Sequence, residues 1–513
     1  MAKEVSFEEK LWKSAIKLRG GVETAEYKHV VLSLIFLKYV NDRFDKQLNK
    51  ITEEFGEEYI DIPEFYIKDN AFYIPETSRW SYIMENAKQS DIAIKIDTAL
   101  HDIELNNEGL KGALPNNYYS RLEIDHTKLA SLLDVINTIK IKDDEEDSIG
   151  RIYEYFLGQF AGKEGQGKGE FYTPKSVVKL IAELIEPYDG KIYDPCCGSG
   201  GMFVQSMEFI KQHEGNSKNV SIYGQEAIAT TRKLAMMNLA IRGISYNLGE
   251  KNADTFLNDL HKDLKADYIM ANPPFNLDSW REENQLINDY RWSGYEVPPV
   301  GNANYAWILH MVSKLSENGV AGFILSNGAL NSSGVEYNIR KKLIEWIESI
   351  MVLPMKLFYS TNISVTLWVI NKNKVETSIK KNDEIKTYRN RKDEVIFFDL
   401  RNMGSPYNKK YVELTDDDRK KVVETFHRWQ LDISDYEDVP EFCYSASLDE
   451  IKENDYDLSP SQYIEFINKD ETMDYDSEMT RLSRELEELL KEESNSTDIL
   501  IKLMKELDYE IRL

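Results

Sequence analysis

The feature that most constrains the fold is a glycine-rich turn between a short apolar run and a helical segment. The apolar run ends at Tyr193, the turn reads Asp-Pro-Cys-Cys-Gly-Ser-Gly-Gly, and the helical pattern starts at Met202. Glycines permit a tight turn and a close approach of a ligand to the backbone, and the first N–H groups of the helix have no intrahelical partners. The turn therefore predicts a site for a nucleotide-like ligand. The expected ligand-binding residues are Asp194, Gly198, Ser199, Gly200 and Gly201.

Short apolar runs alternate with helical segments along the middle of the chain. Runs separated by helices of this kind are typical of βαβ units in a mostly parallel sheet. The sequence therefore predicts an α/β fold. The expected strands are Lys191–Tyr193, Val220–Tyr223, Tyr268–Met270, Val320–Leu325, Ile350–Leu353 and Val365–Ile370.

Helical patterns occupy both ends of the chain. Apolar residues recur at spacings of three and four from Phe7 to about Ile141, and an acidic linker follows. Near the C-terminus, two leucine stripes flank a Ser-Asn-Ser-Thr sequence, which predicts two amphipathic helices that dock on the α/β domain or on a partner. The stripes are Leu482, Leu486 and Leu489, then Leu500, Leu503 and Leu507. We expect a helical domain over residues 1–148, an α/β domain over 149–470 and a C-terminal helical, partner-binding segment over 471–513.

Charge and residue types exclude several classes of protein. Lys and Arg number 63 against 89 Asp and Glu, a net charge of −26, so the chain does not coat nucleic acid by charge alone. The three cysteines and seven histidines lack metal-ligand or disulfide spacing, which predicts no metal site. The N-terminus has no apolar leader, and the stretch Val30–Val40 is about half the ~20 residues that span a bilayer. We therefore expect a cytoplasmic protein with no membrane segment.

A carboxylate follows the second expected strand. Glu226 comes three residues after Tyr223. An ionised carboxylate can accept hydrogen bonds from both hydroxyls of a ribose. Alone, Glu226 would be an exposed surface residue, but its place one element after the glycine turn favours a ribose contact.

The sequence Asn272-Pro273-Pro274-Phe275 ends another expected strand. Two prolines cannot continue a central strand, so the chain turns out at the carboxyl edge of the sheet, close to the glycine turn. The Asn272 side-chain carbonyl and a proline backbone carbonyl can both accept hydrogen bonds from an amino group, and Phe275 offers a face for stacking worth ~1–3 kcal/mol. The alternative is an ordinary turn. Together with the glycine turn and Glu226, the sequence predicts a site for an amino group on a planar ring.

These motifs, in this order, resemble the amino-methyltransferases that use S-adenosylmethionine and modify DNA bases. Other segments are similar to the modification (methylation) subunit of type I restriction-modification systems, so the resemblance runs from about Leu11 through the α/β core. These segments are Leu11–Lys13, Lys17–Gly20, Glu26–Leu32, Leu34–Lys38 and Gly169–Lys175. The resemblance implies a Rossmann-like methyltransferase core that transfers a methyl group from S-adenosylmethionine to the exocyclic amine of adenine in a specific double-stranded DNA site.

The resemblance also assigns residues to the cofactor. In similar methyltransferases an acidic residue at the place of Asp254 contacts the adenine amine of the cofactor, whereas the local alternative is a helix cap. The segment before the helix at Val177 is implied to bind S-adenosylmethionine, whereas the local alternative is a helix capped by Thr173 with Pro174 at its first position. The residues of that segment are Glu170, Phe171, Tyr172, Thr173, Pro174 and Lys175.

The implied partners are double-stranded DNA, a specificity subunit, a second copy of the modification subunit and restriction (nuclease) subunits. Because the chain is acidic and carries no recognisable base-reading module, we expect it to bind DNA weakly by itself and the specificity subunit to read the sequence. The stretch Lys372–Lys392 holds eight basic and three acidic residues, net +5. For that stretch, and for the segment Asn276–Asn304 that could close over an extruded base, a plain surface loop is the alternative.

Two other functions stay open. Enzymes that methylate RNA or protein amines also use Asn-Pro-Pro-aromatic turns, although they usually lack the large N-terminal helical domain. A non-catalytic scaffold subunit is the second alternative, and it predicts damaged cofactor or catalytic motifs. Both motifs are intact in this sequence.

Overall fold

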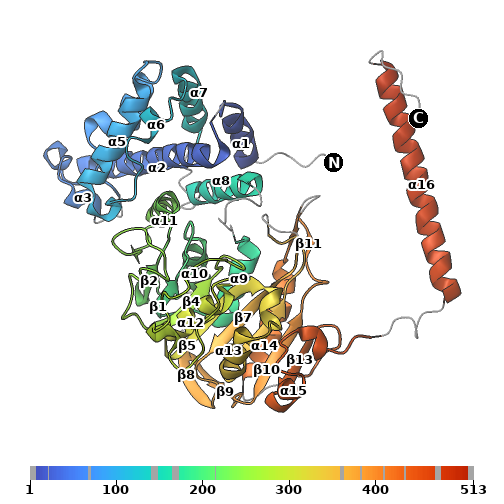
Figure 1. The fold of residues 1–513 in the computed structure, drawn as a ribbon. Helices are drawn as coiled ribbons and strands as arrows, with labels where there is room; N and C mark the ends of the chain where they lie inside the picture. Colours follow the sequence, from blue (N-terminus) through green and yellow to red (C-terminus); the bar gives the residue numbers. More distant parts are fainter. Residues whose placement is uncertain are drawn as a thin grey trace. The chain divides into compact units, whose positions relative to one another are not determined.

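A computed structural model shows the chain as two compact units, Met1–Ile464 and Glu465–Leu513 (Figure 1). The division of the first unit near residue 148 stays a prediction. The described residues are 7–20, 22–67, 71–139, 148–164, 173–213, 215–358, 363–381, 384–407, 411–431, 435–467 and 475–506.

The N-terminal part of the first unit is helical, as predicted. Its longest helix, α2 (Thr24–Glu54), is buried on all sides from Tyr27 to Asn41 because α8 (Ser148–Glu164) and other helices surround it. The apolar stretch noted in the sequence is therefore a central core helix. None of the described helices is long and apolar enough to cross a membrane. The other helices of this part are α1 (Phe7–Lys17), α3 (Glu64–Ile67), α4 (Trp80–Glu85), α5 (Ile92–Asn106), α6 (Tyr118–Arg121) and α7 (His126–Asn137).

A mostly parallel sheet forms the rest of the first unit. Within the described residues it has nine strands in the order β13-β10-β6-β7-β5-β4-β1-β2-β3. All six expected strands are present, which confirms the α/β prediction. The strands are β1 (Gly190–Asp194), β2 (Val220–Gly224), β3 (Tyr246–Asn247), β4 (Ala266–Ala271), β5 (Leu315–Ser326), β6 (Ile347–Val352), β7 (Val365–Asn371), β10 (Glu394–Asp399) and β13 (Cys443–Ser447).

Strand β7 runs antiparallel to both of its neighbours, β5 and β6. All seven of its residues are buried, so it is a central strand despite its reversed direction. The connection from β6 to β7 spans residues 353–364, and its described residues form no crossover helix. Strands β1, β2, β4 and β5 pair in parallel, and their carboxyl ends share one edge of the sheet.

Helices cover both faces of the sheet. Helix α11 also contacts α2, and the Tyr39 hydroxyl donates a hydrogen bond to the Ile241 carbonyl at 2.5 Å. The N-terminal helices thus share a hydrophobic core with one face of the sheet. The helices of this part are α9 (Lys175–Ile185), α10 (Gly201–Gln212), α11 (Ala229–Ile241), α12 (Asn304–Lys314), α13 (Val335–Leu343), α14 (Asp416–Gln430) and α15 (Leu448–Glu453).

The second unit contains one helix, α16 (Tyr475–Glu506), where the sequence predicts two. The Ser-Asn-Ser-Thr segment remains helical. These residues favour caps, but their helix propensity is only a few tenths of a kcal/mol below that of the best formers, and the segment holds no Gly or Pro to break the helix. The expected stripe residues Leu482, Leu486, Leu489, Leu500 and Leu503 are exposed, and Leu507 lies outside the described residues.

Candidate active site

Three sequence motifs meet at the carboxyl edge of the sheet. Strand β1 ends at Asp194, where the glycine turn begins, and its parallel neighbour β2 is aligned so that Asp194 pairs with Gly224. Strand β4, the other parallel neighbour of β1, ends at Ala271, directly before Asn272. The parallel register therefore brings the glycine turn, Glu226 and Asn272 together, as the sequence predicts.

The glycine turn has the conformation that its composition predicts. Gly198 and Gly200 have φ values of 54° and 79°, in the left-handed region that favours glycine. A Cβ added at Gly198 or Gly201 would meet no atom within 4 Å, whereas one at Gly200 would contact Ala235 and Leu239 of α11 at 3.6 Å. Gly198 and Gly201 thus border open space, while Gly200 packs towards the helix behind the turn.

Glu226 is tied to this turn. Its Oε2 accepts a hydrogen bond from the Gly198 N–H at 3.0 Å, and its Oε1 accepts one from the Ile228 N–H at 2.9 Å. The side chain is buried next to Asp194, which accepts a hydrogen bond from the Cys196 N–H at 3.0 Å. Burial, with a smaller contribution from the charge of Glu226, raises the pKa of Asp194 to about 7. A ribose contact by Glu226 stays a prediction.

Asn272 has an unusual hydrogen-bonding state for a buried amide. Its Nδ2 donates to Thr173 Oγ1 at 2.9 Å, which joins the end of β4 to the segment before α9. Its Oδ1 is buried and has no hydrogen-bond partner among the described residues. A buried amide oxygen normally has a hydrogen-bond partner, so this oxygen is an acceptor that lacks a donor among the described residues.

Pro273 is buried, whereas Pro274 and Phe275 are half-buried. The Phe275 ring meets Phe358 edge to face, with ring centroids 6.4 Å apart and an interplanar angle of 72°. The turn thus places an acceptor without a partner among the described residues and a half-buried aromatic ring at one edge of the sheet, and their binding of an amino group on a planar ring stays a prediction.

The start of α9 differs by one residue from the expected helix cap. Pro174 is the N-cap, with extended dihedral angles, and the helix begins at Lys175. Thr173 does not cap the helix because it lies before the N-cap, where its hydroxyl accepts the hydrogen bond from Asn272. Lys175 pairs with Glu154 of α8 at 3.4 Å and with Glu208 of α10 at 3.5 Å. The other members of this candidate set, Glu170, Phe171 and Tyr172, lie outside the described residues.

Asp254 caps its own loop. Its Oδ1 accepts hydrogen bonds from the N–H groups of Phe256 and Leu257, each at 2.8 Å, and the residue is exposed. The same loop lies against the candidate site because the Ala253 N–H donates to the Glu226 carbonyl at 3.0 Å. Residues 255–258 form a turn and not a helix, so Asp254 caps a turn where the local alternative was a helix cap, and contact with a cofactor adenine stays a prediction.

Two residues that hold the candidate site were missed in the sequence. Gln225 is fully buried, and its side chain braces the loop of Asp254 through Ala253, Asn258 and Leu260. Asn276, directly after the Asn272–Phe275 turn, is hydrogen-bonded to α12 and β5. In the sequence, only the position of Asn276 directly after the motif could have indicated that it belongs to the candidate site.

The segment from Asn276 to Asn304 is well packed. Trp280 and Trp292 are buried, and Arg291 donates hydrogen bonds to the carbonyls of Thr255 and Phe256 at 3.1 and 2.7 Å. The segment is therefore anchored to the loop that precedes β4. Closure over an extruded base stays a prediction.

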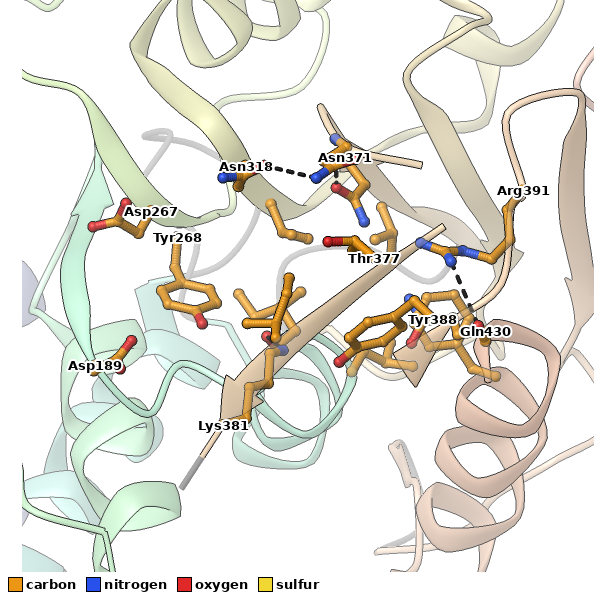
Figure 2. A pocket seen from close by; sticks show the side chains of 17 residues that line it. Asp189, Asp267, Tyr268, Asn318, Asn371, Thr377, Lys381, Tyr388, Arg391 and Gln430 are labelled. Carbon is orange, nitrogen blue, oxygen red and sulfur yellow. Dashed lines mark hydrogen bonds between the residues drawn. The ribbon is translucent and has the colours of Figure 1, made fainter. Parts of the chain in front are cut away.

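The basic stretch Lys372–Lys392 does not form a free cationic surface. It is largely the hairpin of β8 (Thr377–Lys381) and β9 (Glu384–Tyr388), beside a cavity of about 240 Å³ at the opposite, amino edge of the parallel strands (Figure 2). Three buried or half-buried acids pair with four of its eight cations: Glu186 with Lys381 and Lys386, Glu394 with Arg389, and Glu348 with Arg391. The sequence hypothesis of a DNA-facing cationic loop has no support in this arrangement. The described residues also contain no cluster of side chains suited to a metal ion.

Comparisons with known proteins identify the family of the chain. Residues 144–472 match the N-6 DNA Methylase family, and residues 7–139 match the HsdM N-terminal domain. The chain is 41% identical over 416 residues to the type I restriction enzyme HindI methylase subunit of Haemophilus influenzae, covering 76% of this chain and 89% of that protein. It is 34% identical over 528 residues to the type I restriction enzyme MjaIX methylase subunit of Methanocaldococcus jannaschii, covering 98% and 92%.

A solved structure shows the same fold. The crystal structure of the type I restriction-modification system methyltransferase subunit from Streptococcus thermophilus superposes with a TM-score of 0.74 at 24% identity, covering 89% of this chain and 99% of that one. The relatives and the family match favour the DNA methyltransferase interpretation over the RNA, protein or scaffold alternatives. The chain therefore belongs to the N-6 DNA methylase family, among the methylase subunits of type I restriction-modification systems, and its activity is adenine-specific DNA methylation.

Proposed function

We propose that the carboxyl edge of the sheet binds S-adenosylmethionine at the glycine turn and the target adenine at Asn272. The observation that carries the proposal is the buried Oδ1 of Asn272, which has no partner among the described residues. The exocyclic amine of adenine is a donor that matches this acceptor. The open space beside Gly198 and Gly201 fits a cofactor that approaches the backbone closely.

The geometry assigns a role to each part of the site. When bound, S-adenosylmethionine supplies an electrophilic methyl group. Asn272 Oδ1 and the Pro273 carbonyl accept hydrogen bonds from the target amine and direct its lone pair, while the Phe275 ring stacks on the base. No general base is needed before transfer, so positioning and electrostatics supply most of the rate.

The target adenine must leave the duplex to reach this edge. Its amine is paired inside double-stranded DNA, and flipping the base out costs a few kcal/mol. The buried acceptor at Asn272 offsets part of this cost, because the flipped amine regains a hydrogen-bond partner. In this proposal Phe275 replaces part of the lost stacking.

We also propose that a specificity subunit brings the chain to its DNA site. A net charge of −26 opposes binding to a polyanion, and four of the eight cations of Lys372–Lys392 are paired with acids within the fold. Helix α16 exposes a stripe that includes Leu482, Leu486 and Leu489, which suits docking on a partner helix. A second modification subunit and restriction subunits complete the proposed assembly, which would act in the cytoplasm.

Transfer of tritium from labelled S-adenosylmethionine tests this function. The chain, with and without a specificity subunit, is incubated with duplex DNA, RNA and protein substrates. We expect label only in DNA, on the adenine amine, and mainly when both subunits are present. The Asn272→Ala variant serves as the inactive control. Label in RNA or protein, or equal labelling by the variant, would contradict the proposal.

A further inference from the structure

Asn276 follows the Asn272–Phe275 turn and adopts an uncommon backbone conformation. Its φ is 50°, in the left-handed region that asparagine tolerates better than most residues. The residue is exposed as a whole, yet its side-chain Oδ1 is saturated with hydrogen bonds. The donors are Asn304 Nδ2 at 2.9 Å, Ser326 Oγ at 2.9 Å and Asn302 Nδ2 at 3.3 Å.

The backbone of Asn276 is held as well. Its N–H donates to Asn304 Oδ1 at 3.0 Å, so the two asparagines form a reciprocal pair of hydrogen bonds. Asn304 Nδ2 also donates to Ser326 Oγ at 3.2 Å, which closes the network. A residue fixed by both its backbone and its side chain has little freedom to shift.

The partners of Asn276 belong to the rigid scaffold. Asn304 is the first residue of α12 and is 1% exposed, while Ser326 is the last residue of β5 and is 5% exposed. Strand β5 pairs with β4, the strand that leads into Asn272. The chain is therefore fixed on both sides of the turn, by β4 before it and by Asn276 after it.

We propose that Asn276 is a positioning residue for methyl transfer, and this proposal rests on the function proposed above. By fixing the exit of the turn, Asn276 sets where the Pro273 carbonyl and the Phe275 ring lie relative to Asn272. These are the groups that receive the flipped base. A displacement of about 1 Å at a reacting centre can lower the rate by ~100-fold, so a clamp at this point has a large effect on turnover.

Three substitutions separate the side-chain clamp from the backbone conformation. Asn276→Gly keeps a residue suited to the left-handed conformation but removes all three hydrogen bonds to Oδ1. Asn276→Asp keeps an acceptor oxygen at the same place. Asn117→Gly is the matched control, because Asn117 is also exposed with a φ of 48° but lies in the N-terminal helical part.

The variants are measured as complexes with the specificity subunit on duplex DNA. For Asn276→Gly we expect kcat to fall by about 10- to 100-fold while KM for S-adenosylmethionine is unchanged. At saturating DNA, Asn276→Asp recovers most of kcat, and Asn117→Gly has the wild-type value. Ser326→Ala added to Asn276→Gly causes no further loss, because both act through one network.

A fluorescence readout separates positioning from a general structural effect. With 2-aminopurine in place of the target adenine, the flipped base is quenched by stacking on Phe275, and Asn276→Gly should reduce this quenching. Wild-type kcat in Asn276→Gly, or an equal loss in Asn276→Asp, would overturn the proposal. Failure of the proposed function is distinguishable, because then Asn272→Ala would transfer methyl groups as well as the wild-type complex does.

Discussion

Replacing Thr173 with valine is expected to disable Asn272 without removing it. Thr173 Oγ1 accepts the hydrogen bond from Asn272 Nδ2 at 2.9 Å, and this bond assigns the other end of the amide, Oδ1, to the target amine. Valine has nearly the shape of threonine but no hydroxyl, so Nδ2 loses its acceptor. The amide can then turn over and present its NH₂ group where an acceptor is needed.

The size of the effect follows from the burial of Asn272. Its side chain is buried, and a buried donor without a partner costs about 1–3 kcal/mol. Since about 1.4 kcal/mol corresponds to a tenfold change in rate, this range corresponds to a loss of roughly 5- to 150-fold. We expect most of this loss in kcat, because the hydrogen bond orients a group that contacts the target and not the cofactor.

Steady-state methyl transfer and calorimetric binding of S-adenosylmethionine test this expectation. Thr173→Ser keeps the hydroxyl and should restore most of kcat, so it serves as the matched control. In an Asn272→Ala background, Thr173→Val should cause no further loss. A raised KM for S-adenosylmethionine with unchanged kcat would refute the reasoning and would assign Thr173 to cofactor binding, as the family resemblance implies.

Four further results are expected. Asn272→Ala should abolish most methyl transfer in the tritium assay while calorimetry finds S-adenosylmethionine affinity within a few-fold of wild type; wild-type turnover would contradict its role. Gly198→Leu should lose cofactor binding with an unchanged circular dichroism spectrum, because the new side chain enters the open space beside the turn. Gly334 also has a positive φ and borders open space, so Gly334→Leu is the control and should bind the cofactor normally. Burial alone would raise the pKa of Glu186, but His427, Lys381 and Lys386 outweigh it and hold that pKa at about 2. Because the folded pKa lies below the ordinary 4.5, ionised Glu186 stabilises the folded state by roughly 3 kcal/mol above about pH 4.5. This contribution is lost as the pH falls towards 2. Glu186→Gln should therefore lower Tm at pH 7 but not near pH 2. The single chain should bind its own DNA site and a scrambled duplex equally weakly at physiological salt, and tight, sequence-dependent binding would disprove the need for a specificity subunit.

Local sequence was sufficient to predict the centre of the candidate site. The glycine turn and the Asn272–Phe275 turn each combine a buried strand with residues that force the chain to leave it, so their place at the carboxyl edge follows from a few neighbouring residues. Glu226 could be placed because parallel strands end at a common edge. Strands β6 and β7 were predicted as strands, but nothing in their own residues indicated that they run in opposite directions.

Contacts between distant residues account for what the sequence did not predict. Asn304 and Ser326 lie 28 and 50 residues after Asn276, and nothing in their immediate neighbours marks them as its partners. Lys381 and Lys386 had no visible partner in the sequence because the acid that pairs with both, Glu186, is some 200 residues away in the chain. At the Ser-Asn-Ser-Thr segment of α16 the prediction of a turn between two helices was wrong. The local preference of these residues for a turn was too weak to end the helix.

The shared core between α2 and α11 limits how this enzyme can be recombined with its relatives. Helix α11 packs on α10 of the α/β core and on α2, and the Tyr39 hydroxyl of α2 donates a hydrogen bond to the Ile241 carbonyl at the end of α11. A chimaera that exchanges only residues before the α/β core would set a foreign α2 against the native α11 and leave mismatched surfaces inside a closely packed interior. A functional exchange of the N-terminal helices between methylase subunits should therefore carry α11 along as part of the transplanted piece.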